Sequence, residues 1–220
     1  MTLSTALSVG CSLIQELLAE AMLAPSSGNL QPYQLHWIRS TEVKAEIAKA
    51  CHSQQAASTA AEIVVISASA AIAKHTAAEQ LAYVEASTTL ESKSKVYYRK
   101  QLGMFNKVLG VGASAIWMPL IYIASLIHPS LSLLPVGSIG SRNWAARNAI
   151  FSAHTIMLAA ASKGIDSCPM EGFSASKIAK LLNLPRGTVV PIVIALGYRA
   201  ADARIETQWR RKLSDALITH

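Results

Sequence analysis

Two short runs of β-branched residues constrain most strongly what this chain of 220 residues can fold into. The segments EIVVISAS at 62–69 and TVVPIVIALGY at 188–198 are apolar almost throughout, which predicts strands buried in a core. A third segment, YQLHWIR at 33–39, also predicts a strand. Long helical segments separate these strands along the chain. This order predicts an α+β fold, an α/β sandwich whose helices flank a modest central sheet.

Five segments have the composition or periodicity of helices: residues 11–24, 41–51, 78–107, 142–163 and 174–183. Pro25 predicts the end of the first helix, and Thr41 is a suitable N-cap for the second. The helix over 142–163 is rich in alanine and apolar on all sides, so we expect it to be buried as a central helix or at a subunit interface.

One long apolar segment stands out within the chain. Between Lys107 and Arg142, 34 consecutive residues carry no formal charge. Three prolines interrupt the segment, so it lacks the roughly 20 consecutive apolar residues that a membrane-spanning helix needs. We expect residues 108–141 to form an apolar helical excursion that packs on the protein or covers a pocket. Contact with a membrane surface is the weaker alternative.

Composition and motif content exclude several classes of protein. Hydrophobic residues make up 51% of the chain, and no repeat or low-complexity linker divides it, so we expect a single domain over 1–220. The net charge of +7 suits an anionic partner. The sequence has no basic stripe interleaved with aromatics, so a small anionic ligand is expected rather than nucleic acid. Three widely spaced cysteines and the absence of a basic segment before the first apolar residues predict a cytoplasmic protein.

The common signatures of catalysis are also missing from the sequence. It contains no GxGxxG after the first strands, no P-loop and no GxSxG. The six histidines show no metal-binding spacing, and no close pair of carboxylates suggests general acid–base chemistry. We therefore assign no catalytic side chain and no metal ligand.

Three polar stretches remain as candidates for a binding site. APSSGNLQPY at 24–33 offers backbone N–H groups and short polar side chains in a turn, although taken alone a helix cap is the better explanation. CPMEGF at 168–173 places a glycine where a flat ligand could approach the backbone, or forms a simple turn. WRRK at 209–212 could bind a phosphate, or be a solvated tail.

In this order and spacing, the three stretches resemble the nitroreductase-like family of FMN-dependent flavoproteins, and the resemblance runs from about residue 12 to residue 213. It implies a homodimer with FMN at the subunit boundary and the helix 142–163 near the two-fold axis. It also implies that the backbone N–H groups of Glu171 and Gly172 point at flavin N5 and O4. The residues expected to bind FMN are Pro25, Ser26, Ser27 and Asn29, which reach the partner's flavin, Pro169, Met170, Glu171 and Gly172 along the isoalloxazine, and Arg210 and Lys212 at the phosphate.

The activity that the resemblance implies is ping-pong hydride transfer from NAD(P)H through flavin N5 to a nitroaromatic, quinone or similar small-molecule acceptor. Donors near N5 and O4 stabilise the charge that develops on reduction, and no general base is required. The excursion at 108–141 would then cap the pocket, with Trp117 and Tyr122 selecting bulky, apolar acceptors.

Two departures from the family pattern keep an alternative open. The first ten residues, MTLSTALSVG, contain none of the basic residues usual there, and CHSQQAAS at 51–58 offers Ser53, Gln54 and Gln55 where another basic residue is usual. Lost charge-assisted contacts, at roughly 1.5–3 kcal/mol each, would weaken FMN binding. The alternative is a flavin-binding or flavin-free relative without reductase turnover, acting in binding or interaction.

Overall fold

A four-stranded antiparallel sheet forms the centre of the protein. The computed structural model describes residue 3 and residues 9–110 and 117–220. The strands lie in the order β1 (Tyr33–Ile38), β2 (Glu62–Ala68), β4 (Val189–Gly197) and β3 (Asp166–Met170), and each pair of neighbours is antiparallel. All three strands predicted from sequence are present, and the CPMEGF stretch supplies the end of the fourth.

The two central strands, β2 and β4, are buried on both faces of the sheet. Val64 and Ile66 face one hydrophobic core, whereas Ile63 and Val65 face a second core on the opposite side. Successive side chains of a strand point to opposite faces, so an apolar residue is needed at every position. This explains why these two strands are continuous apolar runs.

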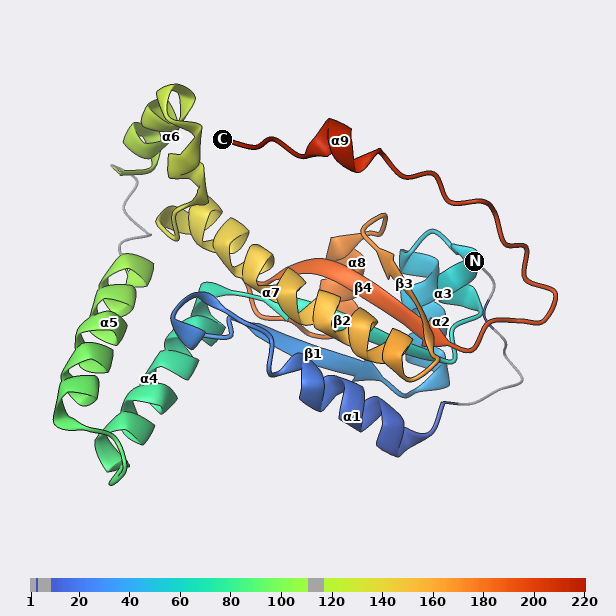
Figure 1. Cartoon of the computed structure of the whole chain (residues 1–220), viewed down its shortest axis with the longest axis horizontal. Coiled ribbons are helices and arrows are strands. Elements are labelled where there is room, and N and C mark those ends of the chain that lie inside the picture. The colour runs from blue at the N-terminus through green and yellow to red at the C-terminus, as the bar shows by residue number, and fades with distance from the viewer. Residues whose placement is uncertain (1–2, 4–8, 111–116) are drawn as a thin grey trace.

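Helices cover both faces of the sheet (Figure 1). On one face lie α1 (Cys11–Ala21) and the long α7 (Gly137–Ser162), and on the other lie α2 (Thr41–Ala50), α3 (Gln55–Ser58) and α8 (Ala175–Leu181). The buried side of α7 consists largely of alanines, which let the helix approach the sheet closely. The predicted α+β sandwich is confirmed.

Two local predictions were wrong. The N-cap of α2 is Ser40 rather than Thr41, because the Ser40 hydroxyl accepts the N–H of Val43 at 3.2 Å. The charged helix expected over 78–107 is two helices, α4 (Ala70–Ala86) and α5 (Ser92–Gly110). The chain breaks after α4 where the Ser87 hydroxyl accepts the N–H of Leu90 at 3.2 Å, a local bond that competes with the helix.

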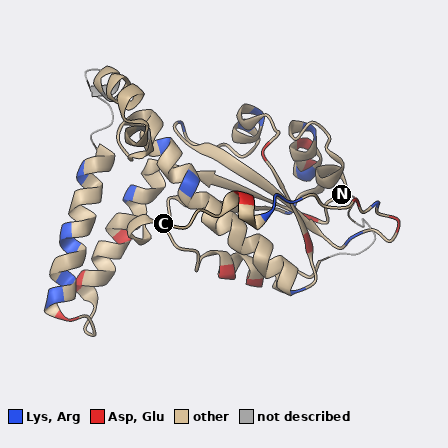
Figure 2. Ribbon diagram, turned by 45° about the horizontal axis from the view of Figure 1, so that its top comes forward, with Lys and Arg blue, Asp and Glu red and all other residues tan. Residues whose placement is uncertain are grey.

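The helices α4 and α5 form a hairpin that extends away from the sheet (Figure 1). Figure 2 marks the lysine and arginine positions along α5 in blue. This helix carries five of the twenty basic residues and no acidic residue, so positive charge is concentrated along it. Among these cations, Arg99 forms an ion pair with Glu85 of α4, which ties the two helices together.

The apolar excursion is helical where the structure describes it. It contains α6 (Trp117–Ile127) and the 3₁₀ helix η2 (Pro129–Leu133). Residues 111–116 and the side chain of Trp117 lie outside the described residues, so the expected contact of Trp117 with a pocket is not tested. Of the helices within 9–110 and 117–220, none has the length and apolar character needed to cross a membrane.

The C-terminal segment runs outside the body of the protein (Figure 1). After β4, the only helix among its residues, all of which the structure describes, is α9 (Leu213–Ala216). Large apolar side chains of the segment are exposed, among them Trp209 at 80% and Ile218 at 78%. The outer face of α7 likewise exposes Phe151 and Leu158. These side chains are accessible to solvent or to another molecule.

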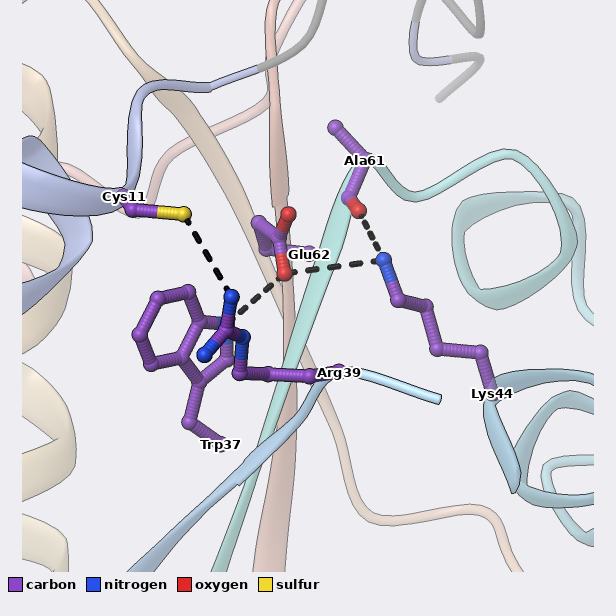
Figure 3. Close-up of polar contacts among 6 residues, drawn as sticks. All are labelled: Cys11, Trp37, Arg39, Lys44, Ala61 and Glu62. Atoms are coloured by element: carbon purple, nitrogen blue, oxygen red, sulfur yellow. Dashed lines mark hydrogen bonds and ion pairs between the residues drawn. The ribbon is translucent and has the colours of Figure 1, made fainter. Parts of the chain in front are cut away.

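A polar cluster joins the ends of β1 and β2 (Figure 3). The Trp37 indole donates to Glu62 Oε2 at 2.7 Å, and Lys44 Nζ donates to the Ala61 carbonyl at 2.6 Å and lies 3.5 Å from the same Glu62 oxygen. The Arg39 guanidinium lies 5.0 Å from the centre of the Trp37 ring. These contacts stabilise the end of the sheet that is farther from the turn before β1.

Candidate functional site

The turn before β1 has a tightly determined backbone. It contains the 3₁₀ helix η1 (Ser27–Asn29), and the Ser26 hydroxyl accepts the N–H of Gln31 at 3.0 Å. Gly28 and Asn29 have φ values of 63° and 55°, in the left-handed region that favours glycine and tolerates asparagine. The turn is therefore more constrained than an ordinary helix cap.

Asn148 of α7 connects this turn to the core. Its side chain is only 4% exposed, its Oδ1 accepts the N–H of Ser27 at 2.7 Å, and its Nδ2 donates to the Trp144 carbonyl at 2.8 Å. A buried amide is costly unless both of its ends are bonded, and here both are. Asn148 was not predicted from the sequence, although a polar residue on the buried side of an alanine-rich helix is a signal that could have identified it.

Phe105 of α5 packs directly on the same turn. A Cβ atom placed on Gly28 would lie 2.6 Å from Phe105 Cε2, so a larger residue does not fit without a shift. The Phe105 ring also lies 6.2 Å from the Trp144 ring, measured between centroids. Through these contacts the α4–α5 hairpin packs against the turn.

The turn at 25–29 is one candidate wall of the site, and the chain just after β3 is the second. Glu171 and Gly172 are exposed, and among the described residues their backbone N–H groups have no hydrogen-bond acceptor. The Gln54 amide donates to the Gly172 carbonyl at 2.8 Å. Gln54, in the segment where the family usually has a basic residue, thus supports this part of the chain. Pro169 is exposed, whereas Met170 is 3% exposed and packs in the core.

The sheet register relates the positions of the two walls. Tyr33, which follows the turn, pairs with Ala68, and Ala68 pairs with Val189 at the start of β4. Met170, which precedes the second wall, pairs with Val193. Three strand spacings, about 14 Å in total, separate β1 from β3. Within one chain, the second wall therefore leaves the sheet on the edge opposite the turn, at Val193, four residues along β4 from the Val189 level of the turn.

The basic pair of the C-terminal segment is not brought to either wall in the single chain. The Arg210 guanidinium bonds only to its neighbours, the Trp209 carbonyl and the Gln208 side chain, both at 2.9 Å. Within the described part of the chain, neither Arg210 nor Lys212 forms an ion pair. Both are exposed, so both are available to an anion or a partner subunit.

The titratable groups near the sheet do not form a catalytic cluster. Burial raises the pKa of the Cys51 thiol to about 11, so this residue remains a neutral core thiol. Burial also lowers the pKa of His36, whose Nε2 lies 2.8 Å from the Ser67 hydroxyl. No group of three or more His, Cys, Asp or Glu residues is placed to hold a metal ion in the described ranges.

Comparison with known proteins gives a consistent result. The model of the nitroreductase family matches residues 8–198. "Putative NAD(P)H nitroreductase MhqN" of Bacillus subtilis (strain 168) is 26% identical over 204 residues, which cover 92% of this chain and 84% of that protein.

Solved structures agree in fold. The nitroreductase family protein of Streptococcus pneumoniae TIGR4 has a TM-score of 0.71 at 20% identity, covering 100% of this chain and 94% of that chain. An Exiguobacterium sibiricum 255-15 protein in complex with FMN has a TM-score of 0.71 at 19% identity, covering 100% and 91%. Because the family model spans most of the sequence, including both candidate walls, the chain belongs to the nitroreductase family.

Proposed function

We propose that this protein is an FMN-dependent NAD(P)H oxidoreductase that acts as a homodimer and reduces nitroaromatic, quinone or similar acceptors in a ping-pong reaction. The observation that carries the proposal is the pair of exposed N–H groups on Glu171 and Gly172, which have no acceptor among the described residues. They follow β3, on the edge of the sheet opposite the turn at 25–29.

The residues present fit FMN. Two adjacent backbone donors suit a flat ligand that has acceptor atoms along one edge. Gly172 has no side chain to keep such a ligand away from the backbone, and Gln54 holds the segment through the Gly172 carbonyl. When bound, FMN would supply a ring system that accepts a hydride at N5 and passes it to the second substrate. The FMN complex of the Exiguobacterium sibiricum protein supports this assignment.

The role of the chain is to bind and orient, not to transfer protons. Glu171 and Gly172 would direct their N–H groups at the flavin edge, where added donors favour the reduced, more negative form. Ser26, Ser27 and Asn29 would bound the site from the other side, together with Pro25. Hydride transfer itself needs no general base.

A second copy of the chain would complete the site. The two walls of one chain lie on opposite edges of its sheet. They are therefore too far apart to bind the same side of one flavin. The exposed apolar face of α7, including Phe151 and Leu158, offers a surface for a partner subunit. We propose that the turn of each subunit faces the flavin held by the other.

The C-terminal basic pair would bind the phosphate of FMN. Arg210 and Lys212 are the cations of this segment that the resemblance assigns to the phosphate, and neither is engaged by a carboxylate among the described residues. A charged hydrogen bond to phosphate is stronger than a neutral one. This pair would offset part of the charge that is missing from the first ten residues.

The visible spectrum of the purified protein tests the proposal. We expect flavin absorption that is bleached by NADH or NADPH under anaerobic conditions and restored by an added quinone. A colourless protein that cannot be reconstituted with FMN would contradict the proposal. Bound FMN that neither coenzyme bleaches would instead support the alternative, a flavin-binding protein without reductase turnover.

A further inference from the structure

The positive charge of this protein is concentrated in one segment of the chain. Residues 92–165 contain eight lysine or arginine residues and no acidic residue. The rest of the sequence has twelve basic and thirteen acidic residues, so this segment accounts for the whole positive net charge. It comprises α5, α6, η2 and α7. Such a separation of charge indicates which part of a protein meets an anionic partner.

The outer side of α5 combines cations with apolar side chains. Lys93, Lys100 and Lys107 are seven residues apart and therefore lie along one side of the helix. All three are exposed, and none has an ion pair or hydrogen bond within the described part of the chain. Tyr97 and Met104, each more than half exposed, lie three or four residues from these lysines and share their side of the helix.

The next helix in the chain, α6, exposes apolar side chains and contains no charged residue. Leu120, Ile123 and Ile127 are each more than half exposed and follow one another at spacings of three and four residues, along one side of the helix. Tyr122 and Leu126 extend the exposed surface around it. Figure 1 shows α5 and α6 at the same end of the molecule, beyond the sheet. A cationic helix and an apolar helix are therefore presented together.

We propose that α5 and α6 bind the surface of a lipid bilayer that contains anionic lipids. The outer side of α5 would place its three lysines at the lipid phosphates, and α6 would insert its apolar side chains at the boundary with the acyl chains. With 11 residues, α6 is about 16 Å long, roughly half the thickness of the hydrocarbon core. Its length therefore suits a helix that lies in the membrane surface.

A bilayer accounts for both helices, whereas other occupants account for one. Nucleic acid would pair with the lysines of α5 but would leave α6 in water. A second copy packed through the same surface would cover α6, but it would bring its own lysines and no carboxylate from residues 92–165 to the contact, so like charges would face each other. From the sequence, membrane contact was the weaker alternative for residues 108–141. The lysines of α5 favour it because they supply the charge that this excursion lacks.

Vesicle flotation tests the proposal on the full-length protein. The unaltered protein should bind vesicles of phosphatidylcholine with about 30% phosphatidylglycerol but not vesicles of phosphatidylcholine alone, and binding should weaken as salt is raised. The variant Lys93→Gln/Lys100→Gln/Lys107→Gln should bind the anionic vesicles roughly 100-fold more weakly, because each lysine near the surface contributes about a fivefold increase in affinity.

Two further variants separate local effects from net charge. Lys177→Gln/Lys180→Gln/Arg186→Gln removes the same charge from exposed positions on and after α8, and it should bind as the unaltered protein does. Leu126→Gln/Ile127→Gln keeps the lysines but removes apolar surface from α6. It should bind at least roughly tenfold more weakly while keeping its salt dependence. All substituted side chains are exposed, so urea unfolding should be unchanged in each variant.

The inference is overturned if the unaltered protein fails to bind anionic vesicles or binds neutral vesicles equally well. It is also overturned if the α5 variant binds as tightly as the α8 control. Sedimentation equilibrium identifies the rival occupant: if Leu126→Gln/Ile127→Gln raises the dissociation constant of the dimer and leaves vesicle binding unchanged, α6 is a subunit contact instead. None of these outcomes depends on FMN, so the proposed function is tested separately.

Discussion

The hydrogen bond between Asn148 and Ser27 allows a direct test of the link between the core and the candidate flavin site. Asn148→Leu keeps the side-chain volume similar but removes the oxygen that accepts the Ser27 N–H at 2.7 Å. The new side chain would occupy a position that is 4% exposed, so it leaves the donor facing an apolar group. We expect the free energy of unfolding to fall by about 1–3 kcal/mol.

The same change should weaken FMN binding. Asn29 and Gln31 hold left-handed backbone conformations, with φ values of 55° and 39°. Such conformations cost about 1–3 kcal/mol each and persist only while the surroundings hold them in place. With Ser27 released, the turn should relax away from the shape that faces the flavin. A loss of about 1–2 kcal/mol corresponds to a roughly 5–30-fold higher dissociation constant.

Two measurements on matched variants separate these effects. Urea unfolding gives the stability, and the quenching of flavin fluorescence on titration gives the FMN dissociation constant. Ser152→Ala is the control, because Ser152 lies one helical turn further along the buried side of α7. Among the described residues the Ser152 hydroxyl has no hydrogen-bond partner. Burial raises the pKa of Tyr33, and the nearby Ser152 hydroxyl offsets part of that rise.

Each possible result has a distinct meaning. If Asn148→Leu is destabilised but binds FMN as tightly as Ser152→Ala does, the turn does not contribute to flavin binding, and the reasoning is refuted. If its stability is also unchanged, the hydrogen bond to Ser27 itself does not form.

Three further predictions concern other parts of the chain. The double variant Arg210→Gln/Lys212→Gln should bind FMN at least roughly tenfold more weakly, because charged hydrogen bonds contribute about 1.5–3 kcal/mol each; titration with riboflavin, which lacks the phosphate, should show no change. Burial raises the Cys51 pKa from 9.0 to about 11, so folding favours the neutral thiol. The resulting stability is fully present below pH 9 and declines as the pH rises towards 11; Cys51→Ala should lack this decline of about 2–3 kcal/mol in urea unfolding. Gly28→Ala should destabilise the protein by about 1–3 kcal/mol, because the new Cβ would meet Phe105 and the residue would keep a φ of 63°; an unchanged thermal midpoint would contradict this.

The helix boundaries show that local residue patterns do not always predict where a helix ends. The segment over 78–107 has a helical composition throughout, yet the chain breaks between Ala86 and Ser92. The break depends on hydroxyl groups that bond to nearby N–H groups, as Ser87 does with Leu90. Whether such a bond replaces a helical turn depends on packing, here the antiparallel contact between α4 and α5, which a residue pattern does not contain.

Contacts between residues far apart in the chain could not be predicted from the sequence for a related reason. Asn148 and Ser27 are 121 positions apart, and Gln54 and Gly172 are 118 apart. Composition and periodicity describe neighbours along the chain, so neither pair could be predicted. The expected binding residues were named by a motif, and their supporting residues became visible only after folding.

The sequence by itself determined the family, the apolar runs of β2 and β4 and the α+β class, because these depend on local chemistry and on motif order. Only the tertiary structure decided that the turn at 25–29 and the segment after Met170 lie on opposite edges of the sheet. It also decided that α5 packs against that turn through Phe105. The physical reason is that strand pairing and helix packing bring together groups far apart in the chain, and their positions depend on register and crossing geometry rather than on the order of residues.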